Sequence, residues 1–149
     1  MTDPILAEGA RTLEPVQAGQ GAAPAEKWTA RLVLFLRLMA AISLVKGLYH
    51  WAVVCGIDAP TAGGFADYST PYEVATAFFA VIDLVAAIGL WLAAPWGAVV
   101  WLTSVISMIT VEVLFPQIYG GRMWVVAAEV VLLANYLWLA PLAAREQPS

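Results

Sequence analysis

The sequence predicts an all-α integral membrane protein, folded as an up-and-down bundle of four transmembrane helices. Hydrophobic residues make up 62% of the 149 residues and charged residues only 12%, whereas an ordinary soluble domain carries about 25% charged residues. Four apolar stretches are separated by turn signals, and a helix needs about 20 apolar residues to cross a bilayer. A soluble fold of this size cannot cover so much apolar surface, so we expect a lipid bilayer around the bundle.

The N-terminal segment 1–27 is rich in Ala, Gly, Pro, Gln and Glu and has no hydrophobic period. This composition predicts a disordered cytoplasmic tail. The segment also lacks the basic start and immediate apolar core of a secretory signal, so we expect the first helix, over 28–54, to stay uncleaved. The fold depends on this helix because it carries Arg37, Lys46 and His50 within an apolar stretch.

A loop is predicted over 55–72. It ends in Thr70-Pro71-Tyr72-Glu73, where the threonine suits the cap, the proline the first helical position and the glutamate the acid of a capping box. The second helix is predicted over 73–93 and the third over 98–115, with a tight turn at 94–97 between them. A short turn over 116–121 leads to the fourth helix, over 122–140. The transmembrane domain is thus 28–141, and 142–149 is predicted to be a short cytoplasmic tail.

Basic and aromatic residues indicate the orientation of the bundle. Arg122 lies alone at one edge, and the other basic residues outside the apolar centre lie on the opposite side: Arg11, Lys27, Arg31, Arg37 and Arg145. The positive-inside rule then places both termini in the cytoplasm. Interfacial aromatic residues agree: Trp28, Trp91, Trp96 and Trp138 are predicted at the inner boundary, and Trp51, Tyr72, Tyr119 and Trp124 at the outer one.

Six ionisable residues form the candidate site, which we call the charge network: Lys46, His50, Asp83, Glu112, Arg122 and Glu129. An unpaired charge at mid-bilayer costs about 3 kcal/mol on insertion scales, so we expect these groups to pair. Lys46 and His50 share a face of the first helix. We expect Lys46 to reach Asp83 or Glu129, and Arg122 to reach Glu112 across the short turn. Arg37 points to the opposite side and is expected to reach the headgroups.

The charge network has two interpretations. As static structure it fixes the register of the helices, which is the interpretation we favour; as a functional site it carries a proton, an ion or a ligand. We expect His50 to be a hydrogen-bonded histidine, since one histidine per chain cannot form a bis-histidine haem site. Cys55 is the single cysteine, which excludes an internal disulfide and a cysteine-built metal site. No cofactor and no metal is expected.

Several function classes are disfavoured. A net charge of −4 and the lack of a basic run argue against nucleic acid. Since the sequence contains no hydrolase constellation, phosphate-binding loop or nucleotide fingerprint, we expect no catalytic residues and no enzyme acting alone. The expected function is that of an accessory or scaffold subunit that binds other membrane proteins or a second copy of itself.

The alternative is a proton- or ion-coupled small transporter subunit. In it, Lys46, Asp83 and Glu129 would form a relay that opens outward past His50 and Glu112. A third interpretation, a redox-associated membrane subunit, needs a cofactor that this chain does not supply alone.

The stretch from Ile88 to Trp101, which reads Ile-Gly-Leu-Trp-Leu-Ala-Ala-Pro-Trp-Gly-Ala-Val-Val-Trp and is preceded by Asp83, resembles a helix–turn–helix of small four-helix inner-membrane proteins of unknown function from alphaproteobacteria. The segments 35–38 (Phe-Leu-Arg-Leu) and 46–50 (Lys-Gly-Leu-Tyr-His) fit the first helix of that group. The chain is also distantly similar to DoxX-like four-helix proteins. The resemblance covers the first three helices. It implies a four-helix membrane fold and, through the DoxX-like proteins alone, redox or quinone-linked partners, but no functional residues.

Overall fold

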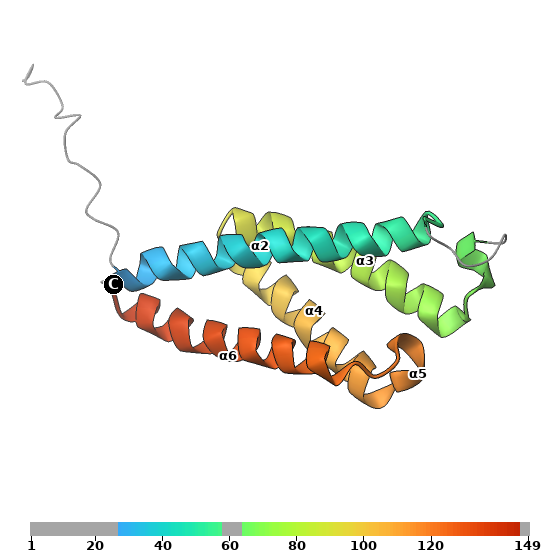
Figure 1. Ribbon diagram of the computed structural model, residues 1–149. Helices are drawn as coiled ribbons and strands as arrows, with labels where there is room; N and C mark the ends of the chain where they lie inside the picture. The colour runs from blue at the N-terminus through green and yellow to red at the C-terminus, as the bar shows by residue number, and fades with distance from the viewer. Residues whose placement is uncertain (1–26, 58–63, 147–149) are drawn as a thin grey trace, which may run out of the picture.

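The computed structural model describes residues 27–57 and 64–146, and this part of the chain is helical, without strands (Figure 1). Its four long helices are α2 (Lys27–Val54), α3 (Thr70–Trp91), α4 (Pro95–Leu114) and α6 (Met123–Glu146). A one-turn 3-10 helix, η2 (Gly64–Asp67), precedes α3, and a one-turn helix, α5 (Pro116–Tyr119), joins α4 to α6. The all-α prediction is confirmed for the described residues. The predicted tail at 1–26, and the segments 58–63 and 147–149, lie outside them.

All four long helices are long and apolar enough to cross a membrane. Even the shortest, α4, has 20 residues, which at 1.5 Å per residue is about 30 Å, the thickness of a hydrocarbon core. Large apolar side chains point outward from every long helix; Leu34 and Trp124 are both 70% exposed. Helices that are apolar on their outer as well as their inner faces are typical of membrane spans.

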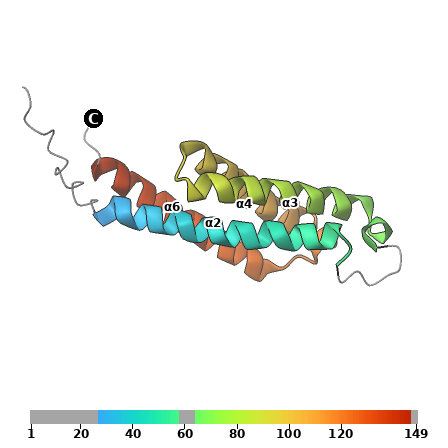
Figure 2. The same cartoon turned by 90° about the horizontal axis from the view of Figure 1, so that it is seen from above.

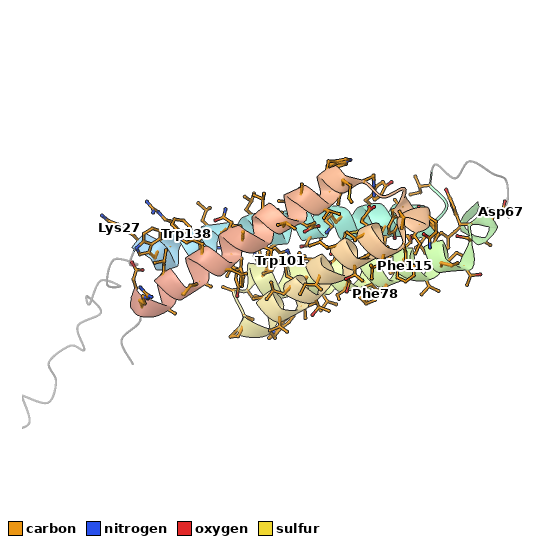
Figure 3. The ribbon with its side chains drawn as sticks, turned by 90° about the horizontal axis from the view of Figure 1, so that it is seen from below. Lys27, Asp67, Phe78, Trp101, Phe115 and Trp138 are labelled. Atoms are coloured by element: carbon orange, nitrogen blue, oxygen red, sulfur yellow. The ribbon has the colours of Figure 1, made fainter. Side chains whose placement is uncertain are left out.

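The helices form a ring in which each packs against its sequence neighbour: α2 on α3, α3 on α4, α4 on α6, and α6 back on α2 (Figures 1 and 2). Lys27 and Trp138 lie together at one end of the bundle, and Asp67 lies at the other (Figure 3). The turn between α3 and α4 lies part way along α2 (Figures 1 and 2). The beginning of α2 and the end of α6 therefore extend beyond the α3–α4 hairpin as a pair.

This displacement of the hairpin changes the predicted aromatic boundary. Arg37 lies over the Trp91 ring, 5.9 Å from its centroid, whereas Trp28 meets Trp138 edge to face, 5.5 Å between centroids. Trp28 and Arg37 are nine residues apart on α2, roughly 13 Å at the helical rise. The tryptophans expected at one inner boundary thus lie at two levels along the bundle.

Glycines set the tight approach of α3 and α4 at their shared turn. A Cβ atom on Gly97 would collide with the backbone of Gly89, and one on Gly89 would collide with Gly97 and the Trp96 ring. Near this turn, three aromatic rings from three different helices pack with centroids 5.6 to 6.5 Å apart: Phe35, Trp101 and Tyr136. This aromatic cluster fills the part of the core towards the Lys27 end, and the buried charges lie beyond it.

The start of α3 differs from the predicted capping box. The helix begins at Thr70 and its N-cap is Ser69, with no side-chain cap hydrogen bond. The Glu73 N–H donates to the Ser69 backbone oxygen instead, at 3.1 Å. The Thr70 capping prediction is therefore wrong, although the helix start is within three residues of the predicted one.

The end of the fourth helix also differs, because α6 continues through Pro141 to Glu146. The Glu146 carboxylate accepts the backbone N–H groups of Trp28 (3.0 Å) and Thr29 (2.9 Å). These N–H groups have no partner within the first turn of α2, so Glu146 gains charge-assisted bonds by staying helical. That gain and the Trp28–Trp138 contact offset the hydrogen bond lost at Pro141, and the predicted tail at 142–149 is helical as far as residue 146.

Candidate functional site

Lys46 joins three helices in the interior of the bundle. Its ammonium on α2 lies 2.8 Å from Glu129 Oε1 on α6 and 3.9 Å from Asp83 Oδ1 on α3. Asp83 is fully buried and Glu129 is 7% exposed, while the Lys46 side chain is 26% exposed. Gly47 on α2 permits a close approach to α3, since a Cβ atom there would meet Leu84. The network therefore holds one cation between two buried carboxylates.

Asp83 also faces Ser104 and His50. The Ser104 hydroxyl on α4 donates to Asp83 Oδ1 at 2.5 Å. Among the described residues, the other oxygen, Oδ2, has no hydrogen-bond partner and neither has His50 Nδ1, although the two atoms are 3.8 Å apart. This separation is too long for a hydrogen bond, and buried polar atoms are rarely left unsatisfied. The two atoms thus lie within about 1 Å of a direct hydrogen bond that would need one proton between them.

Aromatic rings surround His50. Phe79 stacks on the imidazole at 5.7 Å between centroids, and Tyr119 lies at 6.3 Å. The one-turn helix α5 positions Tyr119, whose hydroxyl is hydrogen-bonded to the Thr76 hydroxyl at 3.1 Å. Burial raises the pKa of Tyr119 to about 12, because an apolar environment disfavours the charged phenolate. Tyr119 thus stays a neutral hydrogen-bonding group beside the histidine.

A second ion pair closes the turn before α6. The Arg122 backbone N–H donates to Glu112 Oε2 at 2.8 Å, and its Nε to Oε1 at 3.4 Å. Glu112 is 1% exposed. Gly120 and Gly121 have φ values of 88° and 60°, which glycine adopts without steric cost, and this backbone brings Arg122 back over the end of α4.

A cleft of about 420 Å³ lies between α2 and α6. Lys46, His50, Arg122 and Glu129 are among its lining residues, together with apolar side chains from both helices and Met108 of α4. Asp83 does not line it. The charge network is therefore only partly accessible from the surface. The cleft reaches Lys46, His50 and Glu129, and Asp83 lies behind them.

The structure thus brings four of the six predicted residues into one cluster, Lys46, His50, Asp83 and Glu129. Glu112 and Arg122 form a second pair that borders the same cleft through Arg122. Arg37 is not part of the network, since it is exposed and lies over Trp91.

Three polar residues at the site were not predicted to belong to it: Ser104, Thr76 and Tyr119. Ser104 precedes Met108 and Glu112 at intervals of four residues, so it shares the buried face of α4 with them. That spacing was the available signal for Ser104. Among the described residues, no group of three His, Cys, Asp or Glu side chains could hold a metal ion, and Cys55 is exposed.

The model of a family of unknown function (DUF6163) matches residues 30–147. The matched range contains every residue of the charge network and all of the four long helices except the first three residues of α2. No curated protein and no solved structure matches the chain.

Proposed function

Because the chain belongs to the DUF6163 family, whose function is unknown, we propose a role from its geometry: an accessory subunit of the bacterial inner membrane that acts without catalysis by binding other membrane proteins. The observation that carries this proposal is the pairing of charges inside the bundle. Lys46 is paired with Glu129 at 2.8 Å and Arg122 with Glu112 at 3.4 Å. Paired charges of this kind account for cohesion of the helices without any chemistry.

The location of the ends supports an orientation with both termini in the cytoplasm. The beginning of α2 and the end of α6 lie at the same end of the bundle (Figure 1), where Lys27, Arg31 and Arg145 are found. Arg122 is at the other end of α6, and the positive-inside rule favours the end with more basic residues for the cytoplasm. Fusions of alkaline phosphatase and of a fluorescent protein to each terminus and to the loop after α2 test this: only the loop fusion should give phosphatase activity.

The surface of α6 is the feature that a partner would use. Only Glu129, Leu139 and Ala143 of this helix are buried, so most of its apolar surface is left for lipid or for another membrane protein. The full chain should therefore be purified in a mild detergent from cells with native expression. We expect one membrane protein, or a second copy, at fixed stoichiometry, and reciprocal capture by that partner. A chain that runs as a lone monomer in native-lipid nanodiscs would contradict the accessory role.

A second candidate, a proton-coupled transporter subunit, is favoured by two buried atoms, His50 Nδ1 and Asp83 Oδ2, that have no hydrogen-bond partner in the described part of the chain. The cleft reaches His50, so a proton has a route from the surface to this pair. Asp83→Asn separates the two candidates in liposomes. For the accessory subunit it lowers the stability of the bundle and no proton flux exists to be lost; for the transporter it abolishes a measurable flux while the bundle still melts as the wild type does.

A further inference from the structure

The cleft between α2 and α6 combines apolar walls with a charged interior. Ile42 and Val45 of α2 and Val125 and Leu132 of α6 line it beside Lys46 and Glu129. Tyr49 and Trp124, one on each helix, also line it and are 63% and 70% exposed. Its volume of about 420 Å³ is within the range of small-molecule sites. A ligand that fits this cleft has an apolar body and one polar group.

The charges of the network indicate the sign of that group. Lys46 and Arg122 supply two positive charges, whereas Asp83, Glu112 and Glu129 supply three negative ones. When all three carboxyls are ionised and His50 is neutral, one negative charge of the network has no cation among these groups. A net charge in an apolar environment is costly, so the cleft complements a ligand with a single positive charge.

Lys46 can make room for such a ligand by a small movement. Its ammonium is 2.8 Å from Glu129 and 3.9 Å from Asp83. A shift of about 1 Å would bring it within hydrogen-bond distance of Asp83 and release the Glu129 carboxylate that lines the cleft. Asp83 lies behind the lining and would keep Lys46 as its own partner.

We propose that the α2–α6 cleft binds an amphipathic monovalent cation, such as a lipophilic ammonium or phosphonium, with Glu129 as its counter-ion. The apolar body lies against the walls of α2 and α6, and Tyr49 and Trp124 offer aromatic faces to the charged group. This site does not rest on the accessory function, since a subunit without any protein partner would bind the same ligand.

A proton bound by the network would supply the same missing charge, so protons and the ligand compete. Titratable and charged groups face the site from every helix around it. They are Lys46, Tyr49 and His50 of α2, Asp83 of α3, Glu112 of α4, Tyr119 of α5, Arg122 just before α6, and Glu129 of α6. Ligand affinity should therefore fall as the pH is lowered.

The test uses the full chain in nanodiscs and tetraphenylphosphonium as the probe, with empty nanodiscs subtracted. We expect saturable binding that Glu129→Gln weakens about tenfold or more, which corresponds to at least 1.4 kcal/mol. Glu73→Gln, at the start of α3 and outside the cleft, is the matched control and should bind as the wild type does. Tetraphenylborate, of similar shape and opposite charge, should not bind saturably.

A second variant tests the cleft without changing any charge of the network. Ala128 lines the cleft and is exposed, so Ala128→Trp fills the space without removing a charge and should also abolish binding. Equal binding of tetraphenylphosphonium by wild type and Glu129→Gln would overturn the proposal. So would saturable binding of tetraphenylborate, or a probe affinity that Ala128→Trp leaves unchanged.

Discussion

The Lys46 ammonium and the Glu129 carboxylate, 83 residues apart in the chain, form a 2.8 Å ion pair that fastens α6 to α2. The helix α6 has few buried side chains, and its far end is held to α2 by Glu146. Two charged contacts at different levels, Lys46–Glu129 and Glu146 with the start of α2, thus hold α6 to α2. Each contact can be tested by a substitution.

Replacing Lys46 by methionine leaves the Glu129 and Asp83 carboxylates without their cation. Loss of one partner of a buried pair costs about 3 kcal/mol, so Lys46→Met should lower the free energy of unfolding by about that amount. The measurement is reversible unfolding of the full chain in detergent micelles. Lys27→Met, which removes an exposed lysine at the start of α2, serves as control, and an equal loss in both variants would argue against the network.

Glu146→Gln removes the charge that binds the first N–H groups of α2. The amide group of glutamine is a weaker acceptor, so the Trp28 and Thr29 amides should exchange their protons several-fold faster. Exchange in the middle of α2 should stay unchanged. If the two terminal amides exchange at the wild-type rate, Glu146 does not hold the end of α6.

Gly97→Ala tests the close contact of α3 and α4. The new methyl group would meet the Gly89 backbone, which cannot move aside, and overpacking of this kind costs about 1–3 kcal/mol. Gly47→Ala is the comparison, because its methyl group would meet the Leu84 side chain at 2.8 Å and the Leu84 backbone nitrogen at 3.2 Å, a milder clash than the one with the Gly89 backbone. Gly97→Ala should destabilise the chain more than Gly47→Ala does in the same unfolding assay.

Tyr119 makes stability depend on pH in the alkaline range. Because its pKa is raised to about 12 in the folded chain and is about 10 in an unfolded one, the unfolded state loses this proton first. The contribution of the Tyr119 phenol to the free energy of unfolding is complete below about pH 10 and is lost as the pH rises from about 10 to about 12. Tyr119→Phe removes this contribution, so the curves of unfolding free energy against pH for the wild type and the variant should converge over that range. Parallel curves would show that the phenol is not buried.

The sequence predicted the four long helices and the charged residues that the structure brings together, since both follow from local patterns. Apolar stretches of about 20 residues mark the spans, and the few charges within them single out the groups that must find partners. The spacing of Lys46 and His50 places them on one face of α2. These patterns depend only on neighbours within one helix.

What the sequence could not predict depends on contacts between helices. Helix periodicity does not say that Lys46 is nearer to Glu129 than to Asp83, nor that Ser104 donates to Asp83. A proline such as Pro141 normally ends a helix. Helix α6 continues through it because Glu146 accepts backbone N–H groups at the start of α2. The displacement of the α3–α4 hairpin along α2 has no local signal at all, so the sequence predicts a single level for tryptophans that lie at two levels.

Ionised side chains in this apolar bundle face and stabilise one another. A double-mutant cycle of Lys46→Met and Glu129→Gln, measured by unfolding of the full chain in lipid nanodiscs, tests it most directly. We expect the double variant to be more stable than the sum of the two single losses allows, with a coupling of about 1–3 kcal/mol. Losses that simply add would contradict the claim, because they would show that the two residues do not interact.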